Sequence, residues 1–283
     1  MFRHYLITRF NIVQQWYNNY TTVSGVRIQS EEWLAERFQL FEQYCLPSVA
    51  QQTTKEFVWL VLFNSETPEH YKARLKGYKE QCANFTPLFL EPYGDENALV
   101  RGYILEHTPA GVYQQVLTTR LDNDDAIRCD YLQLMQEAVT PEQTDMFLNY
   151  RYGYQYDIHT HLAYVMDYPA SHYVSRVEVL SPDIQTVLCD HSDLDKLSNY
   201  MELKNVNRGG WIEVITGINA GNRLMRGARP LLLPHPEQFF GASAPHGSVQ
   251  TKMVYVQAMI LHYVMYAWRW TKRKIEKHVL RRC

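Results

Sequence analysis

The sequence predicts an α/β protein with a doubly wound, mostly parallel sheet, a less regular second half and a C-terminal helix. Two observations support this class. Strand-length segments rich in apolar and β-branched residues alternate with segments of helical periodicity, as in sheets whose parallel strands are joined by right-handed crossovers. Residues 57–63 are apolar at every position, which is typical of a strand buried on both faces.

The first half of the chain is expected to hold four strands and two helices. A first strand ends at Arg9, and the polar, turn-rich residues 18–30 follow as a loop. Ser30 then caps a helix whose apolar stripe begins at Trp33 and continues up to Pro47. A second helix is expected over 69–81. The expected strands are 5–8, 57–63, 86–90 and 116–121.

The second half is less regular. A helix is expected over 130–139, and tyrosines at alternate positions from Tyr152 to Tyr156 mark one face of a strand. Further strands are expected over 144–150, 173–179 and 186–189. No repeat, low-complexity linker or charge block divides the chain. We therefore expect a single domain over 1–283, with a first half to about 126 and a second from about 127, on one continuous sheet.

Composition narrows the class of protein. The chain of 283 residues is 46% hydrophobic and 20% charged, which indicates a globular protein with a substantial core. A formal net charge of −2 gives no basic field, so nucleic acid is not expected as a partner. Five scattered cysteines without zinc spacing, and an N-terminus unlike a signal peptide, predict a cytoplasmic protein.

Three carboxylates, Asp122, Asp124 and Asp125, directly follow the expected strand 116–121. A buried strand does not tolerate unpaired charge, so these groups are expected just beyond its end, where a cation can meet them. Carboxylate oxygens favour Mg²⁺ or Mn²⁺, and such ions commonly hold a substrate diphosphate. The motif therefore indicates an enzyme that uses a nucleotide-activated substrate.

An alternative role for these carboxylates is structural. Asp and Asn often form turns or cap helices, and a helix is expected to begin at Asp130. Position favours the functional interpretation, because Arg9 and Asn64 also follow expected strands. Ligands of doubly wound sheets bind beyond the carboxyl ends of the strands, so all of these side chains are expected at one site.

Several motifs in the first half resemble the rhamnosyltransferase family of GT-A-type glycosyltransferases. They are YLITRFN at 5–11, YCLPSV at 44–49 before Gln52, FVWL at 57–60 and TRLDNDDA at 119–126. In the second half, Val177-Glu178, His191 and WIEVITGIN at 211–219 are thinner counterparts. Thr216 stands where the family pattern has a histidine.

The resemblance implies a GT-A-like fold and metal-dependent transfer of a sugar from a nucleoside diphosphate to an acceptor hydroxyl, in surface glycan synthesis. The two halves then become a nucleotide-sugar half and an acceptor half. The implied cofactor is Mn²⁺ or Mg²⁺, and the implied acceptor is a glycan or lipid-linked glycan. The implied metal ligands are Asp122 and Asp124. His191 is a candidate third ligand, because imidazole commonly binds metals beside carboxylates, and the alternative is a His that is only hydrogen-bonded. The implied nucleotide-sugar-binding residues are Thr8, Arg9, Asn64, Arg120 and Asp122.

An inverting transfer needs a general base for the acceptor hydroxyl. Glu178 is the first candidate and Asp190 the second, while Trp211 is the candidate for stacking on the acceptor sugar. Structural alternatives stay open for the other residues. Arg9 and Arg120 also suit ion pairs, Asn64 suits a turn, and Trp211 suits the core.

The C-terminal segment 253–270 is apolar and aromatic, and Lys272, Arg273 and Lys274 follow it. Packing against the body is the favoured interpretation. The alternative is peripheral contact with an anionic membrane, with aromatic side chains at the headgroups.

Two other functions fit parts of the sequence. A non-catalytic nucleotide-sugar or glycan-binding protein would keep the same fold. Nucleotidyl or phosphoryl transfer would use the same carboxylates, but the chain has no G-x-x-x-x-G-K-[ST] loop.

Overall fold

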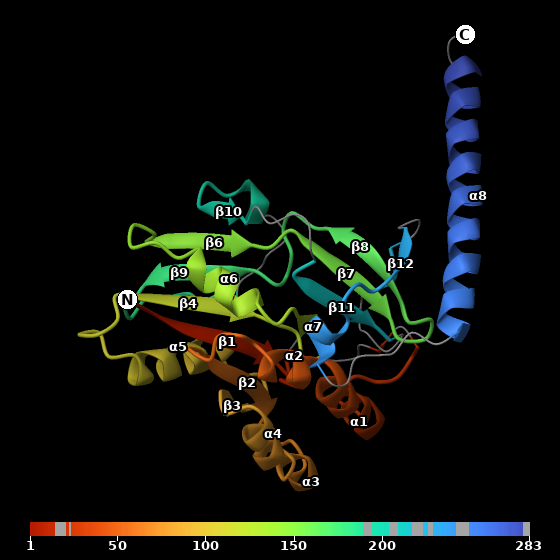
Figure 1. The fold of residues 1–283 in the computed structure, drawn as a ribbon. Coiled ribbons are helices and arrows are strands. Elements are labelled where there is room, and N and C mark those ends of the chain that lie inside the picture. The colour runs from red at the N-terminus through yellow and green to blue at the C-terminus, as the bar shows by residue number, and fades with distance from the viewer. Residues whose placement is uncertain are drawn as a thin grey trace.

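The computed structural model describes residues 1–14, 21–22, 24–188, 194–203, 209–216, 223–225, 229–241 and 249–279, the last with side chains to 272. Its body contains two sheets with helices around them, and one long helix extends from it (Figure 1). The strands of the larger sheet are β1 (Phe2–Arg9), β2 (Val58–Asn64), β3 (Phe85–Leu90), β4 (Gln115–Arg120), β6 (Asp145–Asn149), β9 (Ser175–Val179) and β10 (Tyr200–Glu202).

The larger sheet has the order β10-β6-β9-β4-β1-β2-β3. Strand β1 is parallel to both neighbours, and Ile7 pairs with Leu60 on one side and Arg120 on the other. Strand β9 is antiparallel to β4 and to β6. The expected α/β class with a mostly parallel central sheet is confirmed.

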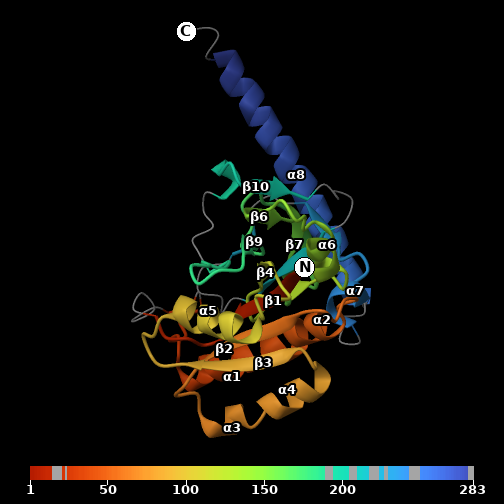
Figure 2. The same cartoon turned by 90° about the vertical axis from the view of Figure 1, so that its left-hand side faces the viewer.

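The central strands are buried on both faces because successive side chains enter different cores. Leu6 and Trp59 belong to one apolar cluster, whereas Tyr5 and Leu60 belong to the other. The first cluster is completed by α1 (Glu31–Leu40), the π-helix η2 (Phe41–Cys45), α2 (Leu46–Ala50), α4 (Leu75–Gln81) and α6 (Tyr131–Glu137). The second is covered by α5 (Glu96–His107), which lies on the other side of the sheet (Figure 2).

The first helical segment begins where expected, because the hydroxyl of Ser30 accepts a hydrogen bond from Trp33 N–H. It does not end at Pro47, as expected, but continues to Ala50. A π-helical turn precedes the proline, and Leu46 N–H bonds to the carbonyl oxygen of Phe41. The wider turn shifts the hydrogen-bond ladder so that Pro47 lies in the first turn of α2, where a proline is tolerated. The expected helix 69–81 divides into α3 (Glu69–Lys72) and α4.

The expectation of one continuous sheet is wrong, because a second sheet holds five strands in the order β12-β8-β7-β11-β5. They are β5 (Ala126–Ile127), β7 (Tyr152–Asp157), β8 (Leu162–Asp167), β11 (Trp211–Ile215) and β12 (Pro230–Leu232). The chain passes from β4 of the first sheet to β5 of the second through residues 121–125. The acidic motif is therefore the junction between the two sheets.

The expected strand 186–189 is absent over its described residues, 186–188. Thr186 has a φ of 60°, outside the range of a strand. Its N–H donates to the Glu178 carboxylate rather than to a neighbouring strand.

The C-terminal helix α8 (Val249–Val279) is longer than the expected 253–270. It packs on the body at β12 and, as far as Arg269, lines a hollow beside β8 and β12, and the rest projects away (Figure 1). Packing along its whole apolar length is therefore not observed. None of the helices in the described ranges combines the length and apolar content that crossing a bilayer requires. The remaining short helices are η3 (Leu194–Lys196) and α7 (Glu237–Phe240).

Candidate active site

Residues 121–125 carry the acidic motif out of the first sheet. Leu121 N–H still donates to the Ile7 carbonyl oxygen at 3.0 Å, whereas Asp125 N–H turns back to that of Asp122 at 3.3 Å. Asn123 donates from its amide to the carbonyl oxygen of Phe10 at 2.7 Å. The motif is thereby fixed beside the segment that follows β1, at the carboxyl edge of the parallel strands.

A cavity of about 220 Å³ lies at this edge. Its walls include four of the residues expected at the site: Arg9, Arg120, Asp122 and Asp124. The other lining residues are Phe10, Asn11, Ile12, Gln14, Ile28, Gln29, Trp33, Arg37, Glu96 and Asn123. A second cavity of about 300 Å³ shares Asn11, Ile28 and Gln29 with the first and is lined by Asn64. The structure therefore brings Arg9, Arg120, Asp122 and Asp124 to one cavity and places Asn64 in the adjoining one.

Asp124 is held by Arg37 from α1. The Nη1 atom of Arg37 lies 2.5 Å from Asp124 Oδ2, and the guanidinium also lies over the Trp33 ring, 5.3 Å from its centroid. Burial raises the pKa of Asp124; Arg37 opposes this shift, and the neighbouring carboxylates add to it, so that the pKa is about 6. Asp124 is thus a buried partner of a cation already present in the protein.

The other two arginines in the cavity wall also face carboxylates. Arg120 Nε lies 3.2 Å from Asp122 Oδ1, and Arg9 Nη2 lies 2.5 Å from Glu96 Oε1. Loss of water contact would raise the pKa of Asp122, but Arg120 outweighs that effect and holds the pKa below its usual value. Asp122 is therefore ionised at neutral pH and faces the cavity.

Asp125 is turned toward the second sheet. Its Oδ1 accepts a hydrogen bond from Val214 N–H at 2.8 Å, and its Oδ2 accepts one from the Tyr173 hydroxyl at 2.7 Å. His172 Nε2 lies 3.7 Å from Asp125 Oδ2. The side chain is 1% exposed, so this carboxylate is positioned by both sheets.

Asp122, Asp125 and His172 form a cluster that could hold a metal ion. Their potential ligand atoms all lie within 4.8 Å of one another. A divalent ion about 2.1 Å from each ligand keeps ligand atoms within about 4.2 Å of one another, so small side-chain movements are enough. The two carboxylates suit Mn²⁺ or Mg²⁺, whereas the imidazole is a ligand of transition-metal ions. Burial lowers the pKa of His172, but the nearby carboxylates outweigh it and the pKa is raised.

This cluster differs from the ligand set that the sequence suggested. Asp122 belongs to it, while the Asp124 carboxylate pairs with Arg37. His172 was not expected at the site. His191 and the second candidate base, Asp190, lie outside the described residues.

Glu213 is a buried carboxyl group near the cluster. It precedes Val214, whose N–H holds Asp125, and its Oε2 accepts a hydrogen bond from Gln155 at 2.8 Å. Burial, followed by the charge of Asp125, raises the pKa of Glu213 to about 7. Glu213 belongs to the motif at 211–219, but the sequence alone assigns this residue no role.

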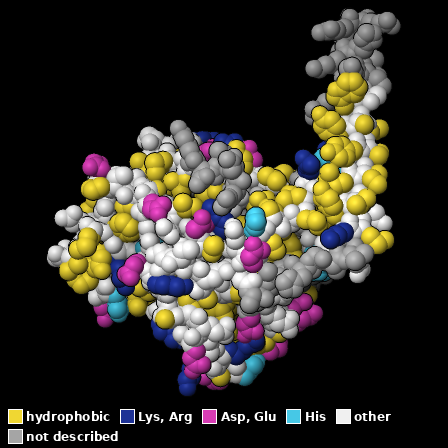
Figure 3. Space-filling view, in the orientation of Figure 1, with side chains coloured by type: hydrophobic (Ala, Val, Ile, Leu, Met, Phe, Trp, Pro, Cys, Tyr) yellow, Lys and Arg dark blue, Asp and Glu magenta, His cyan; other side chains and the backbone are white. Residues whose placement is uncertain are grey.

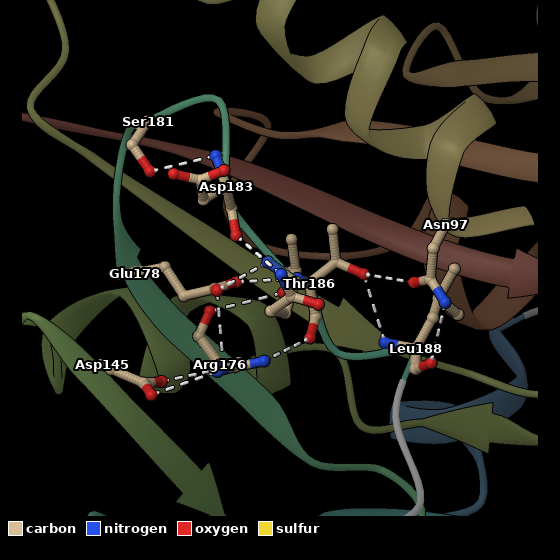
Figure 4. A network of polar contacts seen from close by, with 10 residues as sticks. Asn97, Asp145, Arg176, Glu178, Ser181, Asp183, Thr186 and Leu188 are labelled. Atoms are coloured by element: carbon tan, nitrogen blue, oxygen red, sulfur yellow. Dashed lines mark hydrogen bonds and ion pairs between the residues drawn. The ribbon is translucent and has the colours of Figure 1, made fainter.

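The structure corrects the expectation that Glu178 is the base. Glu178 pairs with Val116 in β4, six residues before Asp122, which is ~20 Å along a strand. Its oxygens accept the backbone N–H groups of Gln185 and Thr186, each at 2.8 Å. Figure 4 shows Glu178 within this network, together with Arg176 and Asp145. Glu178 therefore holds the loop at Gln185 and Thr186, at the opposite end of the strands from the acidic motif.

Two further expectations are corrected by burial. Trp211 is 0% exposed, stacks on Tyr173 with ring centroids 4.5 Å apart and donates from Nε1 to the Tyr150 carbonyl oxygen at 2.7 Å. It is a core residue and does not present a face to an acceptor. Thr8 is also 0% exposed, and its hydroxyl accepts a hydrogen bond from Trp59 Nε1. Thr8 therefore fixes a core tryptophan rather than a nucleotide.

Asn64 combines a turn role with a place in the second cavity. Its side chain accepts a hydrogen bond from Glu66 N–H at 3.1 Å, and its N–H donates to Asn11 Oδ1. The turn shapes the cavity wall.

Comparison with known proteins identifies the class. A family model described as "Putative rhamnosyl transferase" matches residues 4–223. This match covers most of the chain and defines a glycosyltransferase. The chain belongs to the rhamnosyl transferase family. Among curated proteins, none matches the sequence.

Solved structures show weaker similarity. TarS 1–349 of S. aureus is 12% identical with a TM-score of 0.38, and the match covers 75% of this chain and 60% of that one. A nucleotide-diphospho-sugar transferase structure from Desulfovibrio desulfuricans G20, described as putative, is 11% identical with a TM-score of 0.34 and coverages of 71% and 79%. A Bacillus anthracis structure, described as a putative glucose-1-phosphate thymidylyltransferase, is 10% identical with a TM-score of 0.35 and coverages of 75% and 89%. The chain thus spans 60% of the TarS structure it matches.

Proposed function

We propose that this protein transfers a sugar from a nucleoside-diphosphate donor to an acceptor hydroxyl, in the synthesis of a surface glycan. The observation that carries the proposal is the position of Asp122, which belongs both to the cluster with Asp125 and His172 and to the wall of the 220 Å³ cavity. A donor whose diphosphate lies at Asp122 can therefore extend into this cavity.

The proposed cofactor is Mn²⁺ or Mg²⁺, held by Asp122, Asp125 and His172. When bound, such an ion neutralises charge on the leaving diphosphate. Asp125 is already oriented for this task by Val214 and Tyr173. Asp124 supports the site indirectly, because it fixes Arg37 in the cavity wall.

The arginines are proposed to contact the donor phosphates. Guanidinium groups bind phosphate with paired hydrogen bonds, and both Arg9 and Arg120 line the cavity. Arg120 now pairs with Asp122. We expect Arg120 to exchange this carboxylate for a phosphate oxygen when Asp122 takes part in cation binding.

Glu213 is the proposed general base. In the transfer, the acceptor oxygen bonds to the anomeric carbon, the bond from that carbon to the diphosphate oxygen breaks, and the hydroxyl proton passes to Glu213. Its raised pKa of about 7 is suited to accepting a proton at neutral pH. The proposed acceptor is a glycan or lipid-linked glycan, with peripheral membrane contact through α8.

Thermal shift with nucleoside diphosphates tests the site. We expect uridine, guanosine or thymidine diphosphate to raise the Tm only with Mn²⁺ or Mg²⁺ present, because a ligand that binds the folded state stabilises it. Asp122→Asn and His172→Gln should remove this shift. Asp183→Asn is a matched control, since Asp183 is exposed at the far edge of the sheet.

Turnover separates catalysis from binding alone. Release of nucleoside diphosphate from a panel of nucleotide sugars should require the cation and should be lost in Asp122→Asn. Donor binding without release or transfer would support the non-catalytic alternative. Cation-independent release that persists in Asp122→Asn would refute the proposed site.

A further inference from the structure

We propose that α8 binds the surface of an anionic lipid membrane. Thr251 at its start is buried, and half-buried side chains such as Ala258 and His262 face the body, where they border Tyr164 of β8 and Pro230 of β12. From Tyr263 to Lys272, every described side chain is exposed. Met265 and Arg269 line the same hollow, so one side of the helix borders the body as far as Arg269, while its other side chains carry apolar surface into solvent.

The exposed part of α8 is apolar around its circumference. Ile260 is 60% exposed, Tyr266 64% and Trp268 63%, and at 100° per residue these three side chains point in different directions. Figure 3 shows hydrophobic side chains along the projecting helix. A helix that is apolar on all sides is normally surrounded by protein or lipid.

A second copy of the chain fits this surface poorly. A partner helix covers a single stripe of apolar residues and would leave the other directions exposed. The sequence has no acidic residue between 249 and 275, while Lys252, Arg269 and Lys272 lie on the same helix. Two helices placed side by side would therefore bring cations together without carboxylates between them.

An anionic lipid surface matches both properties. Trp268 and Trp270 precede Lys272, and the Lys272 Nζ lies 5.5 Å from the centroid of the Trp268 ring. Indole rings prefer the headgroup region, and each nearby cation is attracted by anionic lipids. The uncharged stretch 253–268 is ~24 Å long as a helix, shorter than the ~30 Å hydrocarbon core. The helix therefore binds at the interface without spanning the bilayer.

Vesicle flotation of the full chain tests this proposal without donor or acceptor, so its result is independent of the transferase proposal. We expect the protein to float with phosphatidylglycerol-containing vesicles at low salt and much less with pure phosphatidylcholine vesicles. Added salt should release it. Brominated lipids should quench tryptophan fluorescence, and Trp268→Gln/Trp270→Gln should lose that quenching together with flotation.

Charge is tested with a matched pair of variants. Lys272→Gln/Arg273→Gln/Lys274→Gln should weaken vesicle binding by roughly tenfold or more. Lys76→Gln/Lys79→Gln removes cations from α4, at the opposite end of the molecule (Figure 1), and should bind as the parent does. Absence of flotation, equal binding to neutral vesicles, or self-association that depends on α8 without vesicle binding would each overturn the proposal.

Discussion

Arg37 and Asp124 form a nearly buried ion pair, with Arg37 Nη1 2.5 Å from Asp124 Oδ2 and side-chain exposures of 10% and 8%. Arg37 also donates to the amide oxygen of Asn123 at 3.2 Å. The carboxylates of the acidic motif therefore have different partners. Asp122 belongs to the cluster with Asp125 and His172, whereas Asp124 pairs with Arg37 of α1. The motif joins a helix to the proposed metal site.

Replacing Asp124 should therefore affect stability as well as activity. In Asp124→Asn, Arg37 becomes a buried cation without its carboxylate, and we expect the free energy of unfolding to fall by about 3–5 kcal/mol. Chemical denaturation measures this change. Glu69→Gln breaks the pair with Lys72, in which Glu69 is 87% exposed, and should cost less than about 1 kcal/mol. Equal effects of the two substitutions would contradict the role of burial.

Replacing Glu213 tests the proposed base. Glu213→Gln keeps the size of the side chain but cannot take the acceptor proton, so we expect kcat to fall by about 10²–10⁴ with donor affinity unchanged. Single-turnover transfer and donor titration measure the two quantities. Glu237→Gln in the exposed part of α7 serves as control. A matching loss of donor affinity would place Glu213 in the donor-binding site instead.

Glu178 should matter for stability alone. Glu178→Ala removes the acceptor for Thr186 N–H, a residue 1% exposed, and an unsatisfied buried donor costs about 1–3 kcal/mol. We expect a lower Tm and unchanged kcat for the folded protein. A large loss of kcat in folded Glu178→Ala would restore the catalytic interpretation.

His4 predicts acid sensitivity of the fold. Burial lowers the pKa of His4 from 6.5 to about 3, and Gln136 donates to its Nδ1 while Nε2–H donates to Thr119. Between these pKa values the unfolded state binds the proton and the folded state does not. Stability is therefore complete above about pH 6.5 and falls by about 1.4 kcal/mol per pH unit as the pH decreases toward 3.

The slope of unfolding free energy against pH tests this effect. His4→Gln removes the titrating group, so its stability should fall less steeply than that of the parent between pH 6.5 and 4.5. The comparison uses slopes, because the substitution also changes stability at every pH. Parallel slopes would show that His4 is not neutral in the fold.

Much of the first sheet could be predicted because strands buried on both faces consist almost entirely of apolar residues. The segment 57–63 is apolar throughout and is indeed a strand buried on both faces. Arg9 and Arg120 end parallel strands and Asp122 follows one. The alternation of strands and helices was therefore enough to predict that they meet at one edge of the sheet. The local pattern contained this information.

Whether a strand is parallel or antiparallel to its neighbours could not be predicted from the composition of the segment. Residues 173–179 look alike as a parallel or an antiparallel strand, but β9 is antiparallel to β4. This direction carries Glu178 to the far edge and brings His172, just before the strand, to the acidic motif. The burial of Trp211 depends on Gly153, which is far from it in the sequence but adjacent in the fold. A Cβ on Gly153 would lie 2.1 Å from a Trp211 ring atom, so the indole packs where only glycine leaves room.

If Asp125 holds the cation as proposed, its hydrogen bond from Val214 N–H would link the association of the two sheets to cation binding. The carboxylate that would hold the ion also accepts Val214 N–H of β11, so a change in one interaction alters the free energy of the other. Such coupling is reciprocal. A substitution in β11 that shifts Val214 N–H would then alter cation binding and, through it, donor affinity, although β11 lies far along the chain from the first sheet.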